Sequence, residues 1–411
     1  MPRLTGPGAS GSTVLRRVAL VSEHASPLVP PGASDAGGQN VYVAELATEL
    51  GRRGLDVVVH TRRDDPQLPH RVRLASHVVV EHVDAGPSAH VPRDALLPVM
   101  DDFAAGLARE WKREPPDVVH ANYWMSGLAA LAAARSLGIP VVQTFHALGA
   151  VKRRHLGSLD PSPPERIAAE RRLASEVDAV AATSAAEVEE LRSLGATPRR
   201  IAVVPCGVDT ALFTPSGPSD ERDAQLRLVT LGRLVDRKGI GDAIRALRLL
   251  PDVELVVGGG SRDGDDLGAA ALRALVRREH VAGRVDFRGP IARERVPALL
   301  RSADAVVCVP WYEPFGMVAL ESAACGTPVV ASAVGGLSET VVDGVTGLLV
   351  PPRAPDRLAF AVRTLLSDEA LRTRLGRAAV ARASLYAWER VAAATVELYS
   401  VVAARPTRLA G

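Results

Sequence analysis

The chain has 411 residues, 47% of them hydrophobic, and this length predicts two or three domains rather than a single core. Its formal charge of +2 is nearly neutral and no long basic block is present, which excludes nucleic acid as a main partner. No apolar run reaches the roughly 18 residues of a membrane-spanning helix and no signal-peptide core precedes Glu23, so we expect a cytoplasmic protein without a transmembrane segment.

Short valine-rich runs alternate with stretches of helical period in the first half of the chain, where Val43, Leu46 and Leu50 mark the apolar face of one helix. This pattern is typical of a parallel sheet that is covered by helices on both faces. The runs that we predict as strands are Arg17–Ser22, Asp56–Thr61, Asp117–His120, Pro140–Phe145, Ala179–Thr183 and Ile201–Pro205.

The second half repeats the pattern, so the predicted fold is α/β, with two Rossmann-like domains that face each other across a cleft. Prolines and glycines between Pro205 and Ser219 interrupt both patterns and indicate the hinge. We therefore place one domain at residues 15–208 and the other at residues 209–385. The predicted strands of the second domain are Leu226–Leu231, Val253–Gly258, Arg284–Arg288, Ala305–Val309, Pro328–Ala331 and Leu348–Val350.

The first predicted strand leads into a loop whose glycines, Gly37 and Gly38, allow the backbone to approach a ligand closely. A dinucleotide oxidoreductase would carry G-x-G-x-x-G directly after that strand, and the chain has no such pattern there. Three cysteines without C-x-x-C spacing argue against a zinc site. We therefore predict no metal ligands and no obligatory cofactor, and we leave Mg²⁺ open.

Lysine is rare in this chain, since only Lys112, Lys152 and Lys238 among its 49 basic residues are lysines. Lys238 lies in a glycine-containing loop after a predicted strand, where it and Arg233 are placed to converge on a diphosphate. A departing pyrophosphate is the charge that a sugar-nucleotide reaction must stabilise. The alternative is a solvated basic loop, and Lys112, within a plain charged stretch, fits a surface position.

The segment from Glu313 to Glu321 lies between an apolar strand and a predicted helix. Because Pro314 suits a first helical turn, the free amides around it are expected to point into the cleft and to bind hydroxyls or phosphates. The amides concerned are those of Phe315, Gly316 and Met317. The two glutamates would then each accept a pair of vicinal hydroxyls from one elongated ligand. An arbitrary pair of glutamates would be a solvated surface pair, but this context favours a sugar-nucleotide site.

This segment, followed by a Gly-Thr-Pro stop and the pair Gly335-Gly336, resembles the signature of family 4 retaining glycosyltransferases of the GT-B fold. The first-domain loop, from His24 to Tyr42, is similar to two relatives within that family. One group is the mycothiol glycosyltransferases, which move N-acetylglucosamine from UDP onto inositol 3-phosphate, and the other is the sucrose-phosphate synthases. The motifs that begin at Tyr123, Thr144 and Ala150 extend the resemblance over nearly the whole chain.

The resemblance implies a role for residues of both domains and a final helix, 386–402, that crosses back onto the first domain. His146 would contact the donor sugar near O6, Glu313 its O3 and O4, and Glu321 the ribose, while Arg293 presents backbone to the base. The implied catalytic residues are His146, Arg233, Lys238 and Glu313. The implied donor-binding residues are Gly38, Arg233, Lys238, Arg293, Glu313, Phe315, Gly316, Met317 and Glu321. The implied acceptor-binding residues are His24, Asp35, Asn40, Arg93, Tyr123 and Lys152.

The acceptor side departs from the mycothiol pattern. Ala147 stands where that group has a threonine, Arg93 replaces a lysine, and an expected arginine falls at either Glu165 or Arg166. A glutamate there would repel a phosphate, whereas an arginine would keep the phosphate site. We therefore expect a small polyhydroxylated acceptor, which either carries a phosphate group or lacks one. Inositol phosphate is one example.

The sequence supplies no obvious nucleophile, and the resemblance implies front-side substitution in which the leaving phosphate acts as base. A sucrose-phosphate-synthase-like transfer to a sugar phosphate is one alternative. The other is a protein that binds a nucleotide sugar, UDP-linked by the resemblance, without transferring it. The nucleotide base, the sugar and the oligomeric state are left open.

Overall fold

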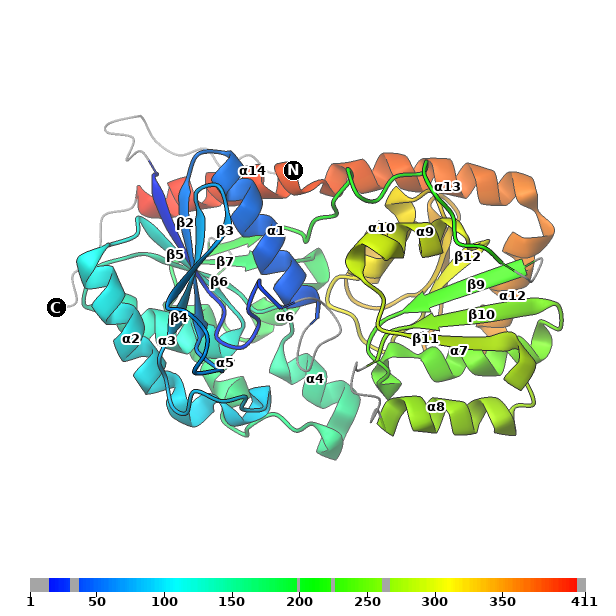
Figure 1. The fold of residues 1–411 in the computed structure, drawn as a ribbon, viewed down its shortest axis with the longest axis horizontal. Helices are drawn as coiled ribbons and strands as arrows, with labels where there is room; N and C mark the ends of the chain where they lie inside the picture. The colour runs from blue at the N-terminus through cyan, green and yellow to red at the C-terminus, as the bar shows by residue number, and fades with distance from the viewer. Residues whose placement is uncertain (1–14, 30–36, 198–199, 223–225, 261–266, 405–411) are drawn as a thin grey trace.

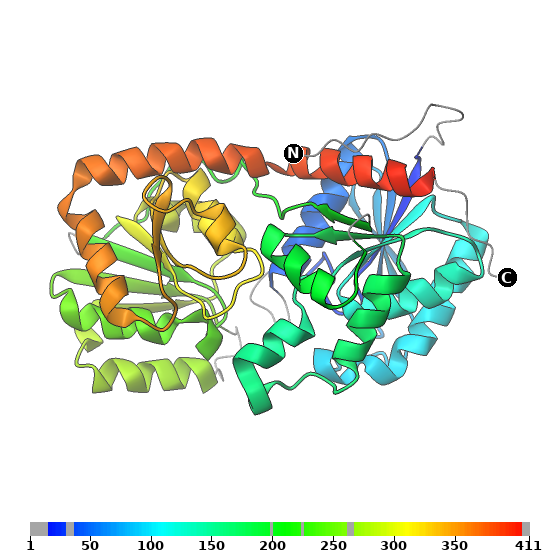
Figure 2. The same cartoon turned by 180° about the vertical axis from the view of Figure 1, so that it is seen from behind.

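The computed structural model describes residues 15–29, 37–197, 200–222, 226–260 and 267–404. Two α/β halves lie side by side along the long axis of the molecule, each built on one sheet (Figure 1). The last two long helices run along one side of both halves, which is also visible from behind (Figure 2). The predicted α/β fold with two parallel-sheet domains is confirmed.

The first sheet has eight strands in the order β3-β4-β2-β1-β5-β6-β7-β8, and every pair except β3 with β4 is parallel. Its strands are β1 (Arg17–Val21), β2 (Asp56–Arg62), β3 (Arg71–Ala75), β4 (Val78–Val83), β5 (Val118–Asn122), β6 (Val141–Thr144), β7 (Ala179–Ala182) and β8 (Ile201–Val203). The helices of this half are α1 (Gly38–Arg52), α2 (Met100–Arg113), α3 (Trp124–Arg135), α4 (Gly149–Leu156), α5 (Arg166–Glu176) and α6 (Ala185–Ser193).

The second sheet has six strands in the order β11-β10-β9-β12-β13-β14. They are β9 (Leu226–Leu231), β10 (Val253–Gly258), β11 (Val285–Gly289), β12 (Ala305–Cys308), β13 (Val329–Ser332) and β14 (Gly347–Val350). The helices that follow β9 along the chain are α7 (Ile240–Ala246), α8 (Leu267–Arg278), α9 (Val296–Arg301), α10 (Met317–Ala324), α11 (Leu337–Thr340), α12 (Pro355–Ser367), α13 (Glu369–Ala383) and α14 (Trp388–Ala403). Short 3₁₀ turns are η1 (Arg93–Ala95), η2 (Leu97–Val99), η3 (Gly157–Leu159), η5 (Asp236–Lys238), η6 (Leu247–Leu249), η7 (Ala282–Arg284), η8 (Arg293–Arg295) and η9 (Ser384–Tyr386).

Both faces of the first sheet are buried because alternate strand residues enter different cores. Val18 and Leu20 of β1 belong to the core that contains α1 and α14, whereas Ala19 and Val21 belong to the core that contains α2 and α3. All predicted strands are present, with ends within two residues of those expected. The prediction missed β3 and β4, the outer hairpin of this sheet.

The chain crosses between the two halves twice, and the crossings touch each other. The Val208 amide donates to the Tyr386 carbonyl at 2.9 Å, and a Cβ at Gly207 would lie 2.4 Å from the Trp388 ring. Helix α14 then packs against α1, β5 and β7. The hydroxyl of its Tyr399 lies 2.6 Å from Nδ1 of His120 in β5. The helix implied at 386–402 is therefore present on the first sheet, while the domain boundary at 208 stays a prediction.

None of the helices in the described parts of the chain combines the length and the apolar character that a membrane crossing requires.

Candidate active site

Lys238 and Glu313 meet at the carboxyl edge of the second sheet. Lys238 ends η5, which follows β9, and Glu313 follows the neighbouring strand β12. The Lys238 ammonium donates to the Glu313 carboxylate. Burial raises the pKa of Glu313, but Lys238, Arg237 and Arg233 outweigh burial and hold this pKa below its ordinary value. Glu313 is therefore ionised at neutral pH within a group of cations. The convergence of Arg233 and Lys238 on a diphosphate stays a prediction.

A glycine contact shapes the segment after Glu313. Gly316 has φ 94° and caps α10, whose first residue is Met317. The Gly336 amide donates to the Glu313 carbonyl at 3.2 Å, and a Cβ at Gly336 would lie 2.3 Å from the Pro314 carbonyl oxygen. The prediction that Pro314 lies in the first helical turn is wrong, because the left-handed Gly316 delays the helix to Met317.

Substitution of Gly336 by alanine is expected to lower kcat/KM for the donor by about 100-fold, because its Cβ must displace the backbone that carries Glu313 and misplacement of about 1 Å has such effects. Steady-state kinetics with varied donor concentration measure this change. Gly283→Ala is the matched control, since nothing lies within 4 Å of a Cβ there. Equal kinetics for the two variants would contradict the role assigned to the Gly336 contact.

Glu321 in α10 is linked to the first half of the chain through one arginine. Arg293 Nη1 donates to Glu321 at 3.2 Å, and Arg293 Nη2 donates to Glu45 of α1 at 3.0 Å. Burial raises the pKa of Glu321 to about 7, although Arg293 opposes this shift. A hydroxyl pair that hydrogen-bonds the Glu321 carboxylate would favour its ionised form. The backbone role that the resemblance implied for Arg293 stays a prediction.

Glu321→Gln is expected to stabilise the protein at high pH. The folded-state pKa of Glu321, about 7, lies above the ordinary value of 4.5, so its favourable contribution is full below pH 4.5 and is lost as pH rises through 7. The amide variant avoids this loss, which is at most about 3 kcal/mol. Thermal melts at pH 5 and pH 8 measure the effect: the Tm of the variant should gain on wild type between these pH values. A constant difference would contradict the raised pKa.

The starts of α1 and α10 face each other between the two halves. A Cβ at Gly38, the first residue of α1, would lie 3.3 Å from Sδ of Met317, the first residue of α10. The first amides of a helix have no partner within the helix, and the helix dipole makes this end attractive to anions. Phe315, next to this contact, is buried and packs edge-on against Tyr386.

His146 follows β6 with φ 58°, which is uncommon for a residue with a side chain and is often found at functional sites. Its Nε2 donates to Oδ1 of Asn122 at 3.0 Å, since the Asn122 amide nitrogen itself donates to the His120 carbonyl. Burial lowers the pKa of His146 to about 3. The ring is therefore neutral at pH 7, and its Nδ1 is left to accept a hydrogen bond from a hydroxyl.

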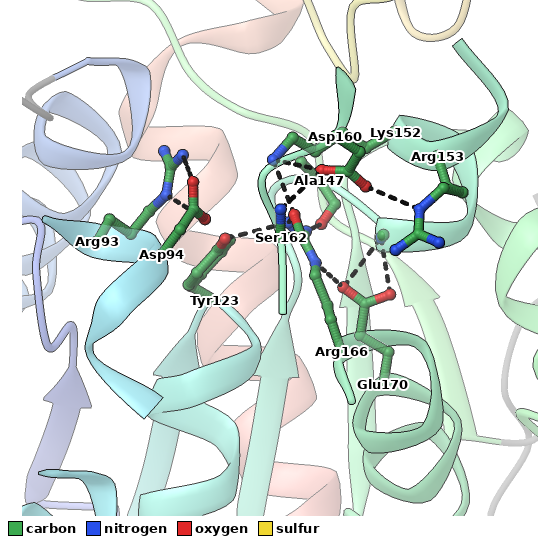
Figure 3. A network of polar contacts seen from close by, with 11 residues as sticks. Arg93, Asp94, Tyr123, Ala147, Lys152, Arg153, Asp160, Ser162, Arg166 and Glu170 are labelled. Carbon is green, nitrogen blue, oxygen red and sulfur yellow. Dashed lines mark hydrogen bonds and ion pairs between the residues drawn. The ribbon is translucent and has the colours of Figure 1, made fainter. Parts of the chain in front are cut away.

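Arg166 lies at the centre of a polar network at the carboxyl ends of β5 and β6 (Figure 3). Its side chain is 2% exposed, and its Nε donates to Glu170 at 2.7 Å. Its two other nitrogens donate to the Tyr123 hydroxyl at 3.1 Å and to the Ala147 carbonyl at 2.6 Å. Glu165 is exposed. The structure therefore directs Arg166, and not Glu165, into this network, and the acceptor-phosphate role of either residue stays a prediction.

Two further cations border this network, each with its own carboxylate (Figure 3). Lys152 Nζ lies 2.9 Å from Asp160 and 2.8 Å from the Ser162 hydroxyl. Arg93 donates to Asp94 at 3.1 Å, and its guanidinium lies 6.0 Å from the centre of the Tyr123 ring. Arg93 and Arg166 thus flank the Tyr123 ring, and Lys152 is joined to Arg166 through the Ser162 hydroxyl, to which both side chains donate. The adjacent carboxylates fix the directions of these three cations.

Comparison with known proteins gives the family. The model of Glycosyltransferase Family 4 matches residues 36–212, and that of Glycosyl transferases group 1 matches residues 216–382. The D-inositol 3-phosphate glycosyltransferase of Kineococcus radiotolerans is 39% identical, over 94% of this chain and 96% of that protein. The chain belongs to glycosyltransferase family 4. It is therefore an enzyme, and the reading as a protein without transferase activity is set aside.

Further relatives and solved structures support the same family assignment. The enzyme of the same name from Acidothermus cellulolyticus is 40% identical over 93% of this chain and 90% of that protein. Among solved structures, a sucrose-phosphate synthase from Thermosynechococcus elongatus matches with a TM-score of 0.87 and 33% identity, over 93% of this chain and 98% of that one. Anabaena HepE, in complex with UDP and glucose, shares the fold with a TM-score of 0.77 at 22% identity, over 94% and 100% of the two chains.

The remaining predicted acceptor residues of the glycosyltransferase differ in their surroundings. The ring of His24 packs edge-on against Tyr123, with centroids 4.9 Å apart. Asn40 is buried; its Oδ1 accepts from the Gly37 amide and its Nδ2 donates to the Ser26 carbonyl, both at 2.9 Å. Asn40 therefore holds the loop at the start of α1. Asp35 lies outside the described residues.

Several residues that are partners of the predicted site residues were missed by the prediction. The carboxylates that orient the cations belong to this group, and one of them had a visible signal, because Glu170 lies four residues after Arg166 on one helix face. Asn122 and Glu45 carry no such local signal, since their partners are distant in the chain. The missed residues are Glu45, Asp94, Asn122, Asp160, Ser162, Glu170 and Arg237.

Within the described residues, one group has the spacing of metal ligands, namely His70, Glu81 and Glu110, whose ligand atoms lie within 4.8 Å of one another. It lies on β4, α2 and the loop before β3, at the outer edge of the first sheet. Arg71 already donates to Glu81 at 2.6 Å. The positive charge of Arg71 weakens the attraction of these carboxylates for a metal ion. We therefore do not include this group in the candidate active site.

Proposed function

We propose that this glycosyltransferase moves a hexose or N-acetylhexosamine from a UDP-linked sugar to a small polyhydroxylated acceptor, with inositol 3-phosphate as the first candidate, and retains the anomeric configuration. The observation that carries the proposal is the burial of Arg166, which is held by Glu170 and contacts the Tyr123 hydroxyl. The relatives at 39% and 40% identity named D-inositol 3-phosphate glycosyltransferase support the same acceptor.

On the donor side, the ionised Glu313 accepts hydrogen bonds from sugar hydroxyls, and the neutral His146 accepts one through Nδ1. Glu321 receives the ribose hydroxyls. The Glu321 carboxylate, which already accepts a hydrogen bond from Arg293, would also accept hydrogen bonds from a bound ribose. Hydrogen bonds to a charged group contribute about 1.5–3 kcal/mol each.

The diphosphate lies between the starts of α1 and α10, within reach of Lys238 and Arg233. Backbone amides near Gly38 and Met317 supply donors without a positive side chain, and the two cations supply charge. When the bond between the anomeric carbon and the phosphate oxygen breaks, the electron pair leaves with the nucleotide diphosphate, and these groups stabilise it. The acceptor oxygen attacks from the same face, and its proton passes to the departing phosphate.

The carboxylates near the donor favour this front-side route over a covalent intermediate. Glu313 is bound to Lys238 and Glu321 to Arg293, so each of these two carboxylates is held by a cation and is proposed to bind ligand hydroxyls. A nucleophile would instead have to reach the anomeric carbon. Catalysis then consists mainly of positioning and charge stabilisation.

On the acceptor side, Arg93, Lys152 and Arg166 are proposed to bind an anionic or polyhydroxylated ligand next to Tyr123. Ala147 provides no hydroxyl, but its carbonyl holds Arg166 at 2.6 Å. The charge of the three cations is balanced by Asp94, Asp160 and Glu170, so a phosphate would bind through directed hydrogen bonds rather than through a net positive field.

A sucrose-phosphate-synthase-like transfer is the second candidate, favoured by the TM-score of 0.87 and 33% identity to the Thermosynechococcus elongatus enzyme. Both reactions use a phosphorylated polyol or sugar, so the same three cations would serve either acceptor. The higher identity to inositol phosphate glycosyltransferases makes the sugar phosphate the less favoured acceptor.

The experiment that tests the proposal is nucleotide release from UDP-N-acetylglucosamine by the purified enzyme, with inositol 3-phosphate, with fructose 6-phosphate or with no acceptor, followed by mass analysis of products. A glycosyl inositol phosphate supports the main proposal. A disaccharide phosphate supports the second candidate. Nucleotide release without either product would retain the donor and overturn both acceptors.

A further inference from the structure

Glu23 is a buried glutamate directly after β1 that none of the contacts above uses. Its side chain is 0% exposed, and its ion-pair partner among the described residues is His24, whose Nδ1 lies 2.7 Å from Oε1. The Ser126 hydroxyl donates to Oε2 and also accepts from the Glu23 amide at 3.0 Å. A buried carboxylate without a lysine or arginine partner costs stability, which calls for a functional explanation.

The Glu23 carboxylate determines which nitrogen of His24 carries the proton. A carboxylate accepts hydrogen bonds and does not donate them, so the His24 proton is held on Nδ1. In the neutral ring, Nε2 then carries the lone pair. In the described parts of the chain, the Glu23 contact is the hydrogen bond made by this ring, which leaves Nε2 for a ligand.

His24 lies between the acceptor cations and the donor-sugar side of the site. Its ring packs edge-on against Tyr123, the residue whose hydroxyl accepts from Arg166. On the other side, His24 follows β1 and His146 follows β6, the two parallel strands that flank β5, so both histidines lie at the same carboxyl edge of the sheet. A hydroxyl that attacks the donor sugar has to lie in this region.

We infer that Glu23 is a positioning residue: it holds His24 so that Nε2 accepts a hydrogen bond from one hydroxyl of the acceptor and thereby directs the acceptor toward the donor sugar. This inference rests on the proposed function for the kind of acceptor. The Glu23 carboxylate and the Ser126 hydroxyl thereby join the groups that determine acceptor binding. Neither group takes part in proton transfer.

Glu23→Gln tests the inference because it keeps the shape but lets an amide N–H face Nδ1, which permits the other tautomer of His24. We expect KM for the acceptor to rise about 10-fold, while KM for the donor and nucleotide release without acceptor stay unchanged. The Tm should equal or exceed that of wild type, because a buried charge is removed. Ser126→Ala should raise the acceptor KM in the same direction by less. Glu49→Gln, a buried glutamate at the far end of α1, is the control.

Monodeoxy analogues of the acceptor identify the hydroxyl. With the analogue that lacks it, wild type should lose about as much as Glu23→Gln loses with the full acceptor, and the variant should lose nothing further. An unchanged acceptor KM in Glu23→Gln, or equal further losses with every analogue, would overturn the inference while transfer by wild type upholds the proposed function. Absence of transfer by wild type to any polyol would overturn both.

Discussion

Lys238→Ala is expected to lower kcat by about 100- to 1,000-fold, the usual effect of removing one donor that stabilises developing charge. The structure supports this because Lys238 is directed at the carboxyl edge of the second sheet by Glu313, beside the starts of α1 and α10. Without the ammonium, Glu313 keeps its burial and loses its closest cation, so its pKa rises and its ionised form is disfavoured. The variant therefore loses a diphosphate contact and a sugar contact together.

Single-turnover and steady-state assays of donor cleavage measure the effect, with thermal melts to verify the fold. Lys112→Ala is the matched control, since Lys112 is exposed on α2. Lys238→Arg should recover only part of the activity, because a planar guanidinium does not replace a compact ammonium. Turnover of Lys238→Ala within about threefold of wild type, a loss of under 1 kcal/mol, would remove Lys238 from the site.

The fold was predictable where one strand corresponds to one apolar run. Interior strands such as β5 and β13 are buried on both faces and therefore read as continuous valine-rich or alanine-rich segments. The outer hairpin was missed because β3 is an edge strand with arginines and its turn places His77 at φ 60°, where asparagine or glycine usually marks a hairpin. The hairpin is stabilised by the pairing of β4 with β2, a tertiary contact that the local sequence of the hairpin does not indicate.

The site was predictable where function depends on motif residues, and less so where it depends on partners from elsewhere in the chain. The association of Lys238 with Glu313 joins two loops whose strands, β9 and β12, are neighbours in the sheet. Each loop was predicted from its own motif, whereas the strand order that brings them together was not. The bridge from Arg293 to Glu45 joins the two halves of the chain, and no spacing in the sequence indicates it. The choice between Glu165 and Arg166 depended on a helix register of one residue, and in the structure Arg166 is buried whereas Glu165 is exposed.

Arg166→Met is expected to cost about 3–5 kcal/mol of folding stability, because it leaves the fully buried Glu170 without its cation. The corresponding fall in Tm is on the order of 10 °C. Where the variant remains folded, kcat/KM for the acceptor should fall by at least about 100-fold, since a charge-assisted contact and the Tyr123 hydroxyl's partner are both lost. Arg172→Met, on the exposed face of the same helix, should change stability by less than about 0.5 kcal/mol.

The double variant Arg166→Met with Glu170→Gln separates the two roles of this arginine. In the wild-type structure, the Gly149 backbone amide donates to both oxygens of Glu170. The glutamine side chain removes the unpaired buried charge, and its carbonyl oxygen still accepts one hydrogen bond from Gly149. We therefore expect about half of the lost stability to return while the acceptor kcat/KM stays as low as in the single variant. Recovery of acceptor kcat/KM together with Tm would show that Arg166 acts only through the fold, and the acceptor phosphate would then have to bind at Arg93 and Lys152.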